Sequence, residues 1–264
     1  MAYQCVNASN QYFTIAAPNI SVPPVTFSVW IKVSSVVSKH TALFIWRGTI
    51  NTGVLLLYTA PNWELRYYVS GGTQWQTATG LNVSTGVWQH VCVAISSSQA
   101  RLYLGGASFT NNVSHATANI NAAGDLARDS LVDSSHTSFD GLAAEPAIWT
   151  AALSDAECLA LSKRVSPLSL TNRLANLVLY RDMIRDLNRG VGPTLTAVNA
   201  PAVVAHPPLV YPQSRLRSAF RSAPVFAPFR LSNAAMHSNP VVQGCAELVG
   251  AVQGLTRPLG EVSS

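Results

Sequence analysis

The chain has 264 residues and a formal net charge of +5, and 11% of its residues are charged. The usual charged share is about 25%, so this composition suits a protein held in a permanent assembly better than a freely diffusing enzyme. The first residues lack the basic and apolar regions of a signal peptide, and no apolar run approaches membrane-spanning length. We therefore expect synthesis in the cytoplasm, no secretion and no membrane partner.

The predicted elements are short apolar or alternating runs, separated by turn residues about every ten positions, as in sandwiches and jelly rolls. We expect strands at residues 11–16, 25–33, 42–46, 54–58, 63–69, 74–79, 87–95, 101–104 and 147–149, and a polar region at 111–125. The pattern predicts an all-β fold, a two-sheet antiparallel jelly-roll sandwich.

The expected strand at 87–95 is apolar on both faces, which indicates a strand covered on both sides, as in a two-sheet sandwich. The two faces carry, in turn, Trp88, His90, Cys92 and Ala94, and Val91, Val93 and Ile95. We expect His90 to be a packed histidine bonded to a backbone group and Cys92 to be a small buried apolar residue. The four cysteines form no C-x-x-C pair, so their spacing is weak evidence for disulfides.

A short helix is predicted after residue 153. Ser154 suits the N-cap, and Glu157 stands three residues later as its capping-box partner. Leu159, Ala160 and Leu161 supply the apolar side, and Pro167 lies beyond the end.

Several blocks of the sequence resemble the laminin G-like, concanavalin A-like jelly rolls common in bacterial and phage proteins. They span about residues 10–165 and are Tyr12–Ile15, Phe27–Ile31, Trp88–Val91, Leu102–Gly106, and Phe139–Gly141 followed by Ala152–Glu157. The family form has an acidic pair after the Phe-x-Gly, where this chain has residues 142–146, and this departure counts against a family calcium site. Residues 186–195 and 206–212 resemble segments that follow such jelly rolls in phage-encoded proteins, which points to a phage virion.

We expect three parts: a laminin G-like jelly roll at 1–165, a strand and loop extension packing on it at 166–205, and an extended Pro- and Arg-rich arm at 206–264. A strand is expected at 176–180 within the extension. Eight of the 15 prolines fall in 201–264, and residues 164–264 hold 10 arginines, no lysine and four acidic residues. The prolines forbid a long helix, and the apolar content is too high for an ordinary disordered linker.

The arm is the predicted partner-binding region. Its candidate contact residues are His206, Arg215, Arg217, Phe220, Arg221, Phe226, Phe229 and Arg230. A basic segment can bind nucleic acid or an acidic protein surface. We favour protein docking over nucleic acid, because four arginines in residues 214–231 are sparse for phosphate contacts and Arg and Phe are common protein anchors.

The sequence shows no catalytic constellation. Glycoside hydrolysis needs two facing carboxyl groups, whereas Glu64 is alone on its expected strand, and Asp140 and Glu145 are expected to be surface or loop acids. There is no G-x-S-x-G or phosphate-loop motif, and the histidines lack metal-ligand spacing. We predict that the protein is not an enzyme.

Two sets of residues are candidate ligand sites. Oxygen-rich loops can hold calcium, and the acids before the last expected strand are Asp125, Asp129, Asp133 and Asp140. Their spacing matches no calcium loop, so we expect solvated acids, with Asp125 and Asp140 as weak calcium candidates and no other cofactor. Tryptophans in sandwiches are usually core, but Trp63 and Trp75 lie next to turns and are the candidate glycan-facing residues.

Together, the low charge, the jelly roll and the arm favour a non-enzymatic structural protein of a phage particle, above all a capsid decoration, cementing or minor capsid protein. Its expected partners are the major capsid protein or other virion subunits, with homo-oligomers in the particle. The alternative is a carbohydrate-binding, host-recognition module of a tail or fibre. A carbohydrate-active enzyme is the third hypothesis, disfavoured by the missing carboxylate pair.

Overall fold

The structure is a computed structural model, and it describes residues 2–36, 40–49, 52–59, 64–69, 74–75, 79–128, 136–184 and 186–210. The chain divides into two units, residues 1–216 and 217–264, and every described residue belongs to the first. Among the described residues, no helix combines the length and the apolar character needed to cross a bilayer.

The first sheet, called here the β4 sheet, has the strand order β11-β10-β9-β4-β15-β1-β19, and β16 pairs with both β15 and β17. Its strands are β1 (Ala2–Cys5), β4 (Val25–Val33), β9 (Trp88–Ile95), β10 (Ala100–Leu104), β11 (Ala107–Asn111), β15 (Gly141–Trp149), β16 (Leu177–Arg181), β17 (Gly190–Val191) and β19 (Ala202–Val204). The first and last described strands therefore pair at one end of this sheet.

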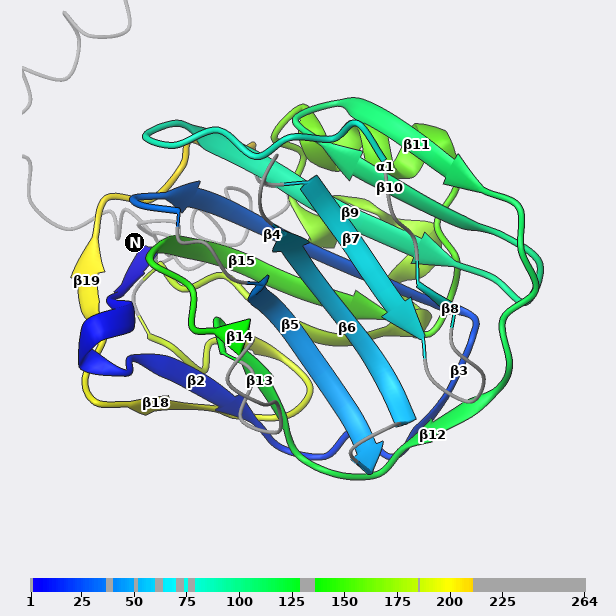
Figure 1. Cartoon of the computed structure of the whole chain (residues 1–264), viewed down its shortest axis with the longest axis horizontal. Helices are drawn as coiled ribbons and strands as arrows, with labels where there is room; N and C mark the ends of the chain where they lie inside the picture. Colours follow the sequence, from blue (N-terminus) through cyan, green and yellow to red (C-terminus); the bar gives the residue numbers. More distant parts are fainter. Residues whose placement is uncertain are drawn as a thin grey trace, which may run out of the picture. The chain divides into compact units, whose positions relative to one another are not determined.

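The second sheet, called the β5 sheet, has the order β18-β2-β13-β5-β6-β7-β8, and β14 pairs with β5. Its strands are β2 (Tyr12–Ile15), β5 (His40–Thr49), β6 (Thr52–Thr59), β7 (Glu64–Val69), β8 (Gln74–Trp75), β13 (Gly124–Leu126), β14 (His136–Thr137) and β18 (Leu195–Val198). A small third sheet joins β3 (Ile20–Val22) to β12 (Ala118–Ile120). Figure 1 looks through the β5 sheet onto the β4 sheet, which shows the two stacked layers.

The main core lies between the two sheets. Alternate residues of β4 and β9 point into it, and they are Val25, Phe27, Val29, Ile31, Val33, Val91, Val93 and Ile95. They pack with Phe13 and Ile15 of β2, Leu65 of β7 and Leu126 of β13. Each fully buried side chain of this kind stabilises the fold by about 1.5–3 kcal/mol. The predicted two-sheet, antiparallel jelly-roll class is confirmed.

The other face of the β4 sheet is covered by a helical layer. Cys92 and Ala94 of β9, together with Ala147 and Trp149 of β15, form a second buried cluster. Its cover comes from α1 (Asp155–Ser162) and from the 3-10 turn η2 (Pro167–Ser169) with Leu170 after it. The 3-10 turns η1 (Asn7–Ser9) and η3 (Thr171–Asn176) contribute no residue to this cluster. Strand β9 is thus covered on both sides, as predicted, but its second cover is helical and not a sheet.

Local sequence signals explain the start of α1. The Ser154 hydroxyl accepts from the backbone N–H of Glu157, and the Glu157 carboxylate accepts from the backbone N–H of Ser154, so the predicted capping box is present. At the preceding corner, the Thr26 hydroxyl donates to the carbonyl of Ala151 at 2.7 Å and accepts from the N–H of Leu153 at 3.0 Å. These bonds fix the path by which the chain leaves β15 and enters α1.

Short strands account for most differences from the sequence prediction. The region 111–125, expected to be polar and irregular, contains β12 and the start of β13. Strands β1, β3, β17, β18 and β19 were not predicted either, since runs of two to four residues show too little periodicity. The expected strand at 176–180 is present as β16, and residues 166–205 supply strands to both sheets.

Candidate functional site

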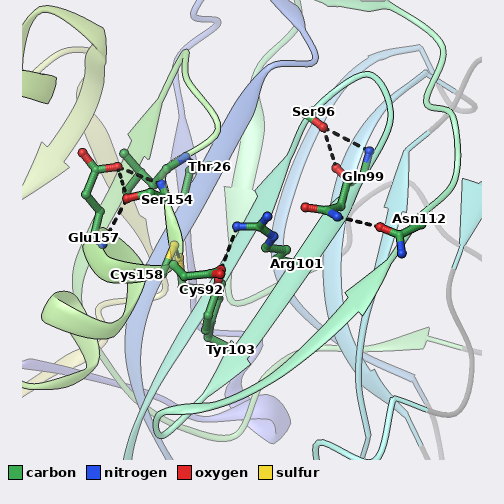
Figure 2. A network of polar contacts seen from close by, with 12 residues as sticks. Thr26, Cys92, Ser96, Gln99, Arg101, Tyr103, Asn112, Ser154, Glu157 and Cys158 are labelled. Atoms are coloured by element: carbon green, nitrogen blue, oxygen red, sulfur yellow. Dashed lines mark hydrogen bonds and ion pairs between the residues drawn. The ribbon is translucent and has the colours of Figure 1, made fainter.

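A polar pocket of about 240 Å³ lies between the β9–β10 turn and the start of α1. We call it the hairpin–helix pocket. It is lined by Ala94, Ser96, Gln99, Arg101, Ala152, Leu153, Ser154 and Arg173. Figure 2 shows this region, with the turn residues on one side and α1 on the other. Sequence reasoning missed the pocket, because its residues are separated along the chain and form no motif.

The turn side of the pocket is held by its own hydrogen bonds. The Ser96 hydroxyl accepts from the Gln99 backbone N–H at 3.0 Å and donates to the Gln99 carbonyl at 3.1 Å. The Gln99 side-chain amide donates to the Asn112 side chain at 2.6 Å (Figure 2). These bonds hold the β9–β10 turn in one conformation, and the turn presents the Gln99 side chain in a fixed position.

The two arginines of the pocket are each oriented by a carboxylate of α1. Arg101 Nη1 donates to Asp155 Oδ1 at 2.8 Å, and the hydroxyl of Tyr103 donates to the same oxygen. Arg173 bonds Glu157 through two nitrogens, with Nε 2.7 Å from Oε1 and Nη2 3.2 Å from Oε2. A guanidinium carries five N–H donors, so each arginine keeps further donors for a ligand.

The electrostatics keep the pair of Glu157 and Arg173 charged. Burial raises the pKa of Glu157, but the hydrogen bonds from Arg173 and from the Ser154 backbone outweigh burial and lower the pKa to about 2. Burial and the bond to Asp155 raise the pKa of Tyr103, which therefore stays a neutral donor. The residues that line the pocket include no carboxylate, imidazole or thiol. This set can bind hydroxyl or carboxylate groups over a small apolar floor, but it supplies no acid–base pair.

Two thiols lie close together in the helical layer next to this pocket. Cys92 of β9 and Cys158 of α1 are both fully buried, and their Sγ atoms are 3.6 Å apart (Figure 2). Burial is the main cause that raises the pKa of Cys92. The predicted burial of Cys92 is confirmed, whereas its neighbour could not be seen in the spacing of the sequence.

A comparison with protein families decides what kind of domain this is. The family model described as the concanavalin A-like lectin/glucanases superfamily, of the laminin G type, matches residues 7–158. The chain belongs to this superfamily. The matched residues run from η1 to the middle of α1, which agrees with the resemblance drawn from the sequence blocks.

Solved structures of low sequence identity are similar to this superfamily member. A heptameric SAP-like pentraxin from Limulus polyphemus is 13% identical over 72% of this chain and 94% of its own, with a TM-score of 0.49. A putative carbohydrate binding protein from Bacteroides ovatus is 13% identical over 78% and 63%, with a TM-score of 0.49. Domain 4 of an extracellular arabinanase from Geobacillus stearothermophilus is 18% identical over 61% and 76%, with a TM-score of 0.47. A search of the curated proteins found no match.

A second polar cluster lies within the concanavalin A-like domain, around Glu145. This residue was expected to be a surface or loop acid, and that prediction is wrong, because Glu145 is 1% exposed and lies within β15. The Tyr180 hydroxyl donates to Glu145 Oε2 at 2.5 Å, and His206 Nε2 lies 2.9 Å from Glu145 Oε1. The pairing of β15 with β4 shifts register between Ala144 and Ala147, and Glu145 has a φ of 54°. This β-bulge turns the carboxylate into the protein.

The structure places the predicted arm residue His206 in this cluster, on the jelly roll itself. His206 Nδ1 is 2.6 Å from the carbonyl of Pro207, which fixes the orientation of the ring beside Glu145. The remaining arm candidates, namely Arg215, Arg217, Phe220, Arg221, Phe226, Phe229 and Arg230, lie outside the described residues.

The weak calcium candidates are not gathered into a metal site. Asp125 is 5% exposed within β13, so its expected solvation is wrong, and Asp140 accepts a hydrogen bond from the hydroxyl of Ser35. Within the described ranges, no group of three or more His, Cys, Asp or Glu side chains could hold a metal ion. Asp129 and Asp133 lie outside those ranges.

Of the two candidate glycan-facing residues, Trp75 lies in β8, where its backbone pairs with Tyr68 of β7, and Trp63 lies outside the described residues.

His90 is packed, as predicted, but its partner differs. Its Nε2 is 2.8 Å from the hydroxyl of Ser28, a side chain and not a backbone group. Its ring lies 5.2 Å from that of Trp30, centroid to centroid. Burial lowers the pKa of His90 to about 3, which keeps the ring neutral.

Proposed function

We propose that this chain is a carbohydrate-binding module and that the hairpin–helix pocket holds a sugar residue. The observation that carries the proposal is the set of donors contributed by Gln99, Arg101 and Arg173 around the apolar floor of Ala94 and Leu153. Ligand sites typically combine an apolar lining with a few fixed polar groups. The pocket volume of about 240 Å³ lies below the roughly 300–1,000 Å³ of drug-sized sites, which suits one sugar ring.

Membership of a superfamily that includes lectins supports the same proposal. The superfamily also includes glucanases, but the residues that line the pocket contain no carboxyl group, and glycoside hydrolysis uses two. We therefore propose binding without turnover, and we expect no product release from a panel of polysaccharides.

A glycan array followed by calorimetric titration of the best ligand tests this function. The double variant Gln99→Ala with Arg101→Gln should lower the affinity about 10- to 100-fold, the cost of about two polar contacts. The matched control is Arg128→Gln, because the Arg128 guanidinium lies over the Tyr12 ring in the β5 sheet. The absence of reproducible binding to any glycan would refute the function.

The tryptophans provide a second arm of the experiment. Loss of binding in Trp63→Ala or Trp75→Ala, with full binding in the pocket variant, would keep the function but move the site to these residues. Loss in the pocket variant alone supports the pocket.

We also propose a second role, as a component of a phage particle anchored by the C-terminal residues. Its support is the uneven charge: residues 1–163 hold 7 basic and 8 acidic residues, whereas residues 164–264 hold 10 arginines and four acidic residues. His206 contacts Glu145, so the deletion should begin after residue 210. A chain ending at residue 210 should remain folded but fail to sediment with the particles, and normal incorporation would contradict this role.

A further inference from the structure

We propose that Cys92 and Cys158 form a disulfide that joins β9 to α1 when the protein meets a thiol-oxidising environment. The two Sγ atoms already lie 3.6 Å apart, in contact across the helix–sheet interface. A disulfide needs about 2.05 Å, so the two elements have to approach by a small shift of the side chains and the helix. This proposal is independent of the proposed functions.

The surroundings favour this pair over other pairs in the described part of the chain. Cys92 and Cys158 belong to one buried cluster with Ala94 and Leu161. Cys5 is also buried, but it belongs to the main core between the sheets. Cys5 is therefore the internal control, and Cys245 lies outside the described residues.

The chemistry is a thiol–disulfide exchange with a small-molecule disulfide as the oxidant. When α1 opens locally, Cys158 loses its proton, attacks one sulfur of the oxidant and releases one small thiolate, which takes up that proton. Cys92 then loses its proton and attacks the Cys158 sulfur of the mixed disulfide, which releases the second small thiol. The two protein thiols are oxidised by two electrons, and the oxidant is reduced to two thiols.

The helix must open for this reaction, because both thiols are fully buried. The pKa of Cys92 is raised by burial, so its thiolate is scarce in the folded protein at neutral pH. We therefore expect slow oxidation of the native protein and faster oxidation during folding. Once formed, the bond closes a loop between residues 66 positions apart in sequence, which restricts the unfolded chain.

The disulfide would also affect the hairpin–helix pocket, which lies next to the helical layer. Ser154 and Leu153, next to the start of α1, line the hairpin–helix pocket, and Ala94 of β9 lines it from the sheet. A covalent link between β9 and α1 would hold these two walls at a fixed separation.

The test uses the full chain with Cys245→Ser, refolded from the reduced state in a glutathione buffer, where access to the thiols does not limit the reaction. Peptide mapping without reductant should find residues 92 and 158 linked. The melting temperature should rise by roughly 5–15 °C and return to its original value when reductant is added. Cys5→Ala should keep the link, and Cys158→Ala should lose it.

Two further variants guard against a folding defect. If Cys158→Ala is poorly folded, Cys158→Val or Cys92→Ala replaces it, with folding checked by circular dichroism. Thiols at 92 and 158 that stay reduced after oxidative refolding would overturn the proposal. Links that involve Cys5 instead, or a linked protein less stable than the reduced one, would overturn it equally.

Discussion

The contact of Glu145 with His206 and the ion pair of Glu157 with Arg173 differ in burial, and this difference separates a structural role from a role in ligand binding. The side chains of Glu145 and His206 are 0% and 13% exposed, whereas Arg173 in the pair with Glu157 is 30% exposed. Burying a polar or charged side chain costs free energy, and the cost is offset only when its partners are buried with it. A partly exposed pair costs little and keeps its arginine accessible to a ligand.

The buried pair therefore has a positional role. Glu145 lies on a bulge of β15, and His206 follows β19, the strand at the end of the β4 sheet. Their contact fastens the segment after β19 to the middle of the sheet. The pair of Glu157 and Arg173 instead fixes the start of α1 to η3 and orients a donor at the hairpin–helix pocket.

Glu145→Ala is expected to have the largest effect on stability. It removes the carboxylate that accepts from the Tyr180 hydroxyl and lies beside the His206 ring, so the free energy of unfolding should fall by about 1–3 kcal/mol for each of the two buried groups that loses this partner. Urea denaturation followed by circular dichroism measures this. The matched change at the other pair, Glu157→Ala, should cost markedly less, and equal losses would show that burial does not distinguish the pairs.

The sequence predicted those features of the two pairs that involve residues close together in the chain. The capping box of Ser154 and Glu157 spans three residues and was predicted correctly. The bulge at Glu145 was not, because Pro146 next to it counts against a strand interior unless a bulge removes the need for its N–H. The contact of Glu145 with His206 joins distant positions, which no local pattern records.

The limit to local patterns also explains how much could be predicted about the faces of the strands. The two-residue period of a strand assigns the side chains of β9 to two faces, and both faces are buried, as expected. Periodicity shows that a face is covered but not what covers it, so the helical layer over Cys92 was not predicted. The hairpin–helix pocket forms at that layer, and it could not be predicted for the same reason.

Lowering the pH should destabilise the protein through His90, which is a buried imidazole without a carboxylate, in contrast to His206 beside Glu145. Burial lowers its pKa from 6.5 to about 3, so the folded state binds fewer protons than the unfolded state between these values. The stability contributed by the neutral ring is complete above pH 6.5 and is lost as the pH falls toward 3. The slope is about 1.4 kcal/mol per pH unit for one proton, or about 2.7 kcal/mol between pH 6.5 and 4.5.

His90→Asn should remove most of this slope, measured by urea denaturation at pH 7, 6, 5 and 4.5. Burial also lowers the pKa of His115, so His115→Asn is the matched control and should remove a smaller share. An unchanged slope in His90→Asn would mean that other groups cause the acid sensitivity.

Glu157→Gln should cost about 1–2 kcal/mol at neutral pH, because it weakens the capping box and the two-nitrogen bond from Arg173. The pKa of Glu157 is lowered from 4.5 to about 2, so its contribution is complete above pH 4.5 and is lost as the pH falls toward 2. The variant and the parent protein should therefore converge in stability near pH 2, as measured by thermal melting. A constant difference from pH 7 to pH 2 would contradict the ionic origin of the effect.

Arg101→Gln should have the smallest effect on stability and a large effect on the proposed ligand. Arg101 and Asp155 are 33% and 62% exposed, and such pairs contribute about 0–1 kcal/mol. The Tyr103 hydroxyl still donates to Asp155, so the start of α1 keeps one of its bonds to β10. Urea denaturation should place the variant within about 0.5 kcal/mol of the parent protein, while titration with the best array ligand should show weaker binding. A loss of several kcal/mol in this variant would show that Arg101 and Asp155 form a structural pair, like that of Glu145. The role of Arg101 would then be to stabilise the fold and not to bind a ligand.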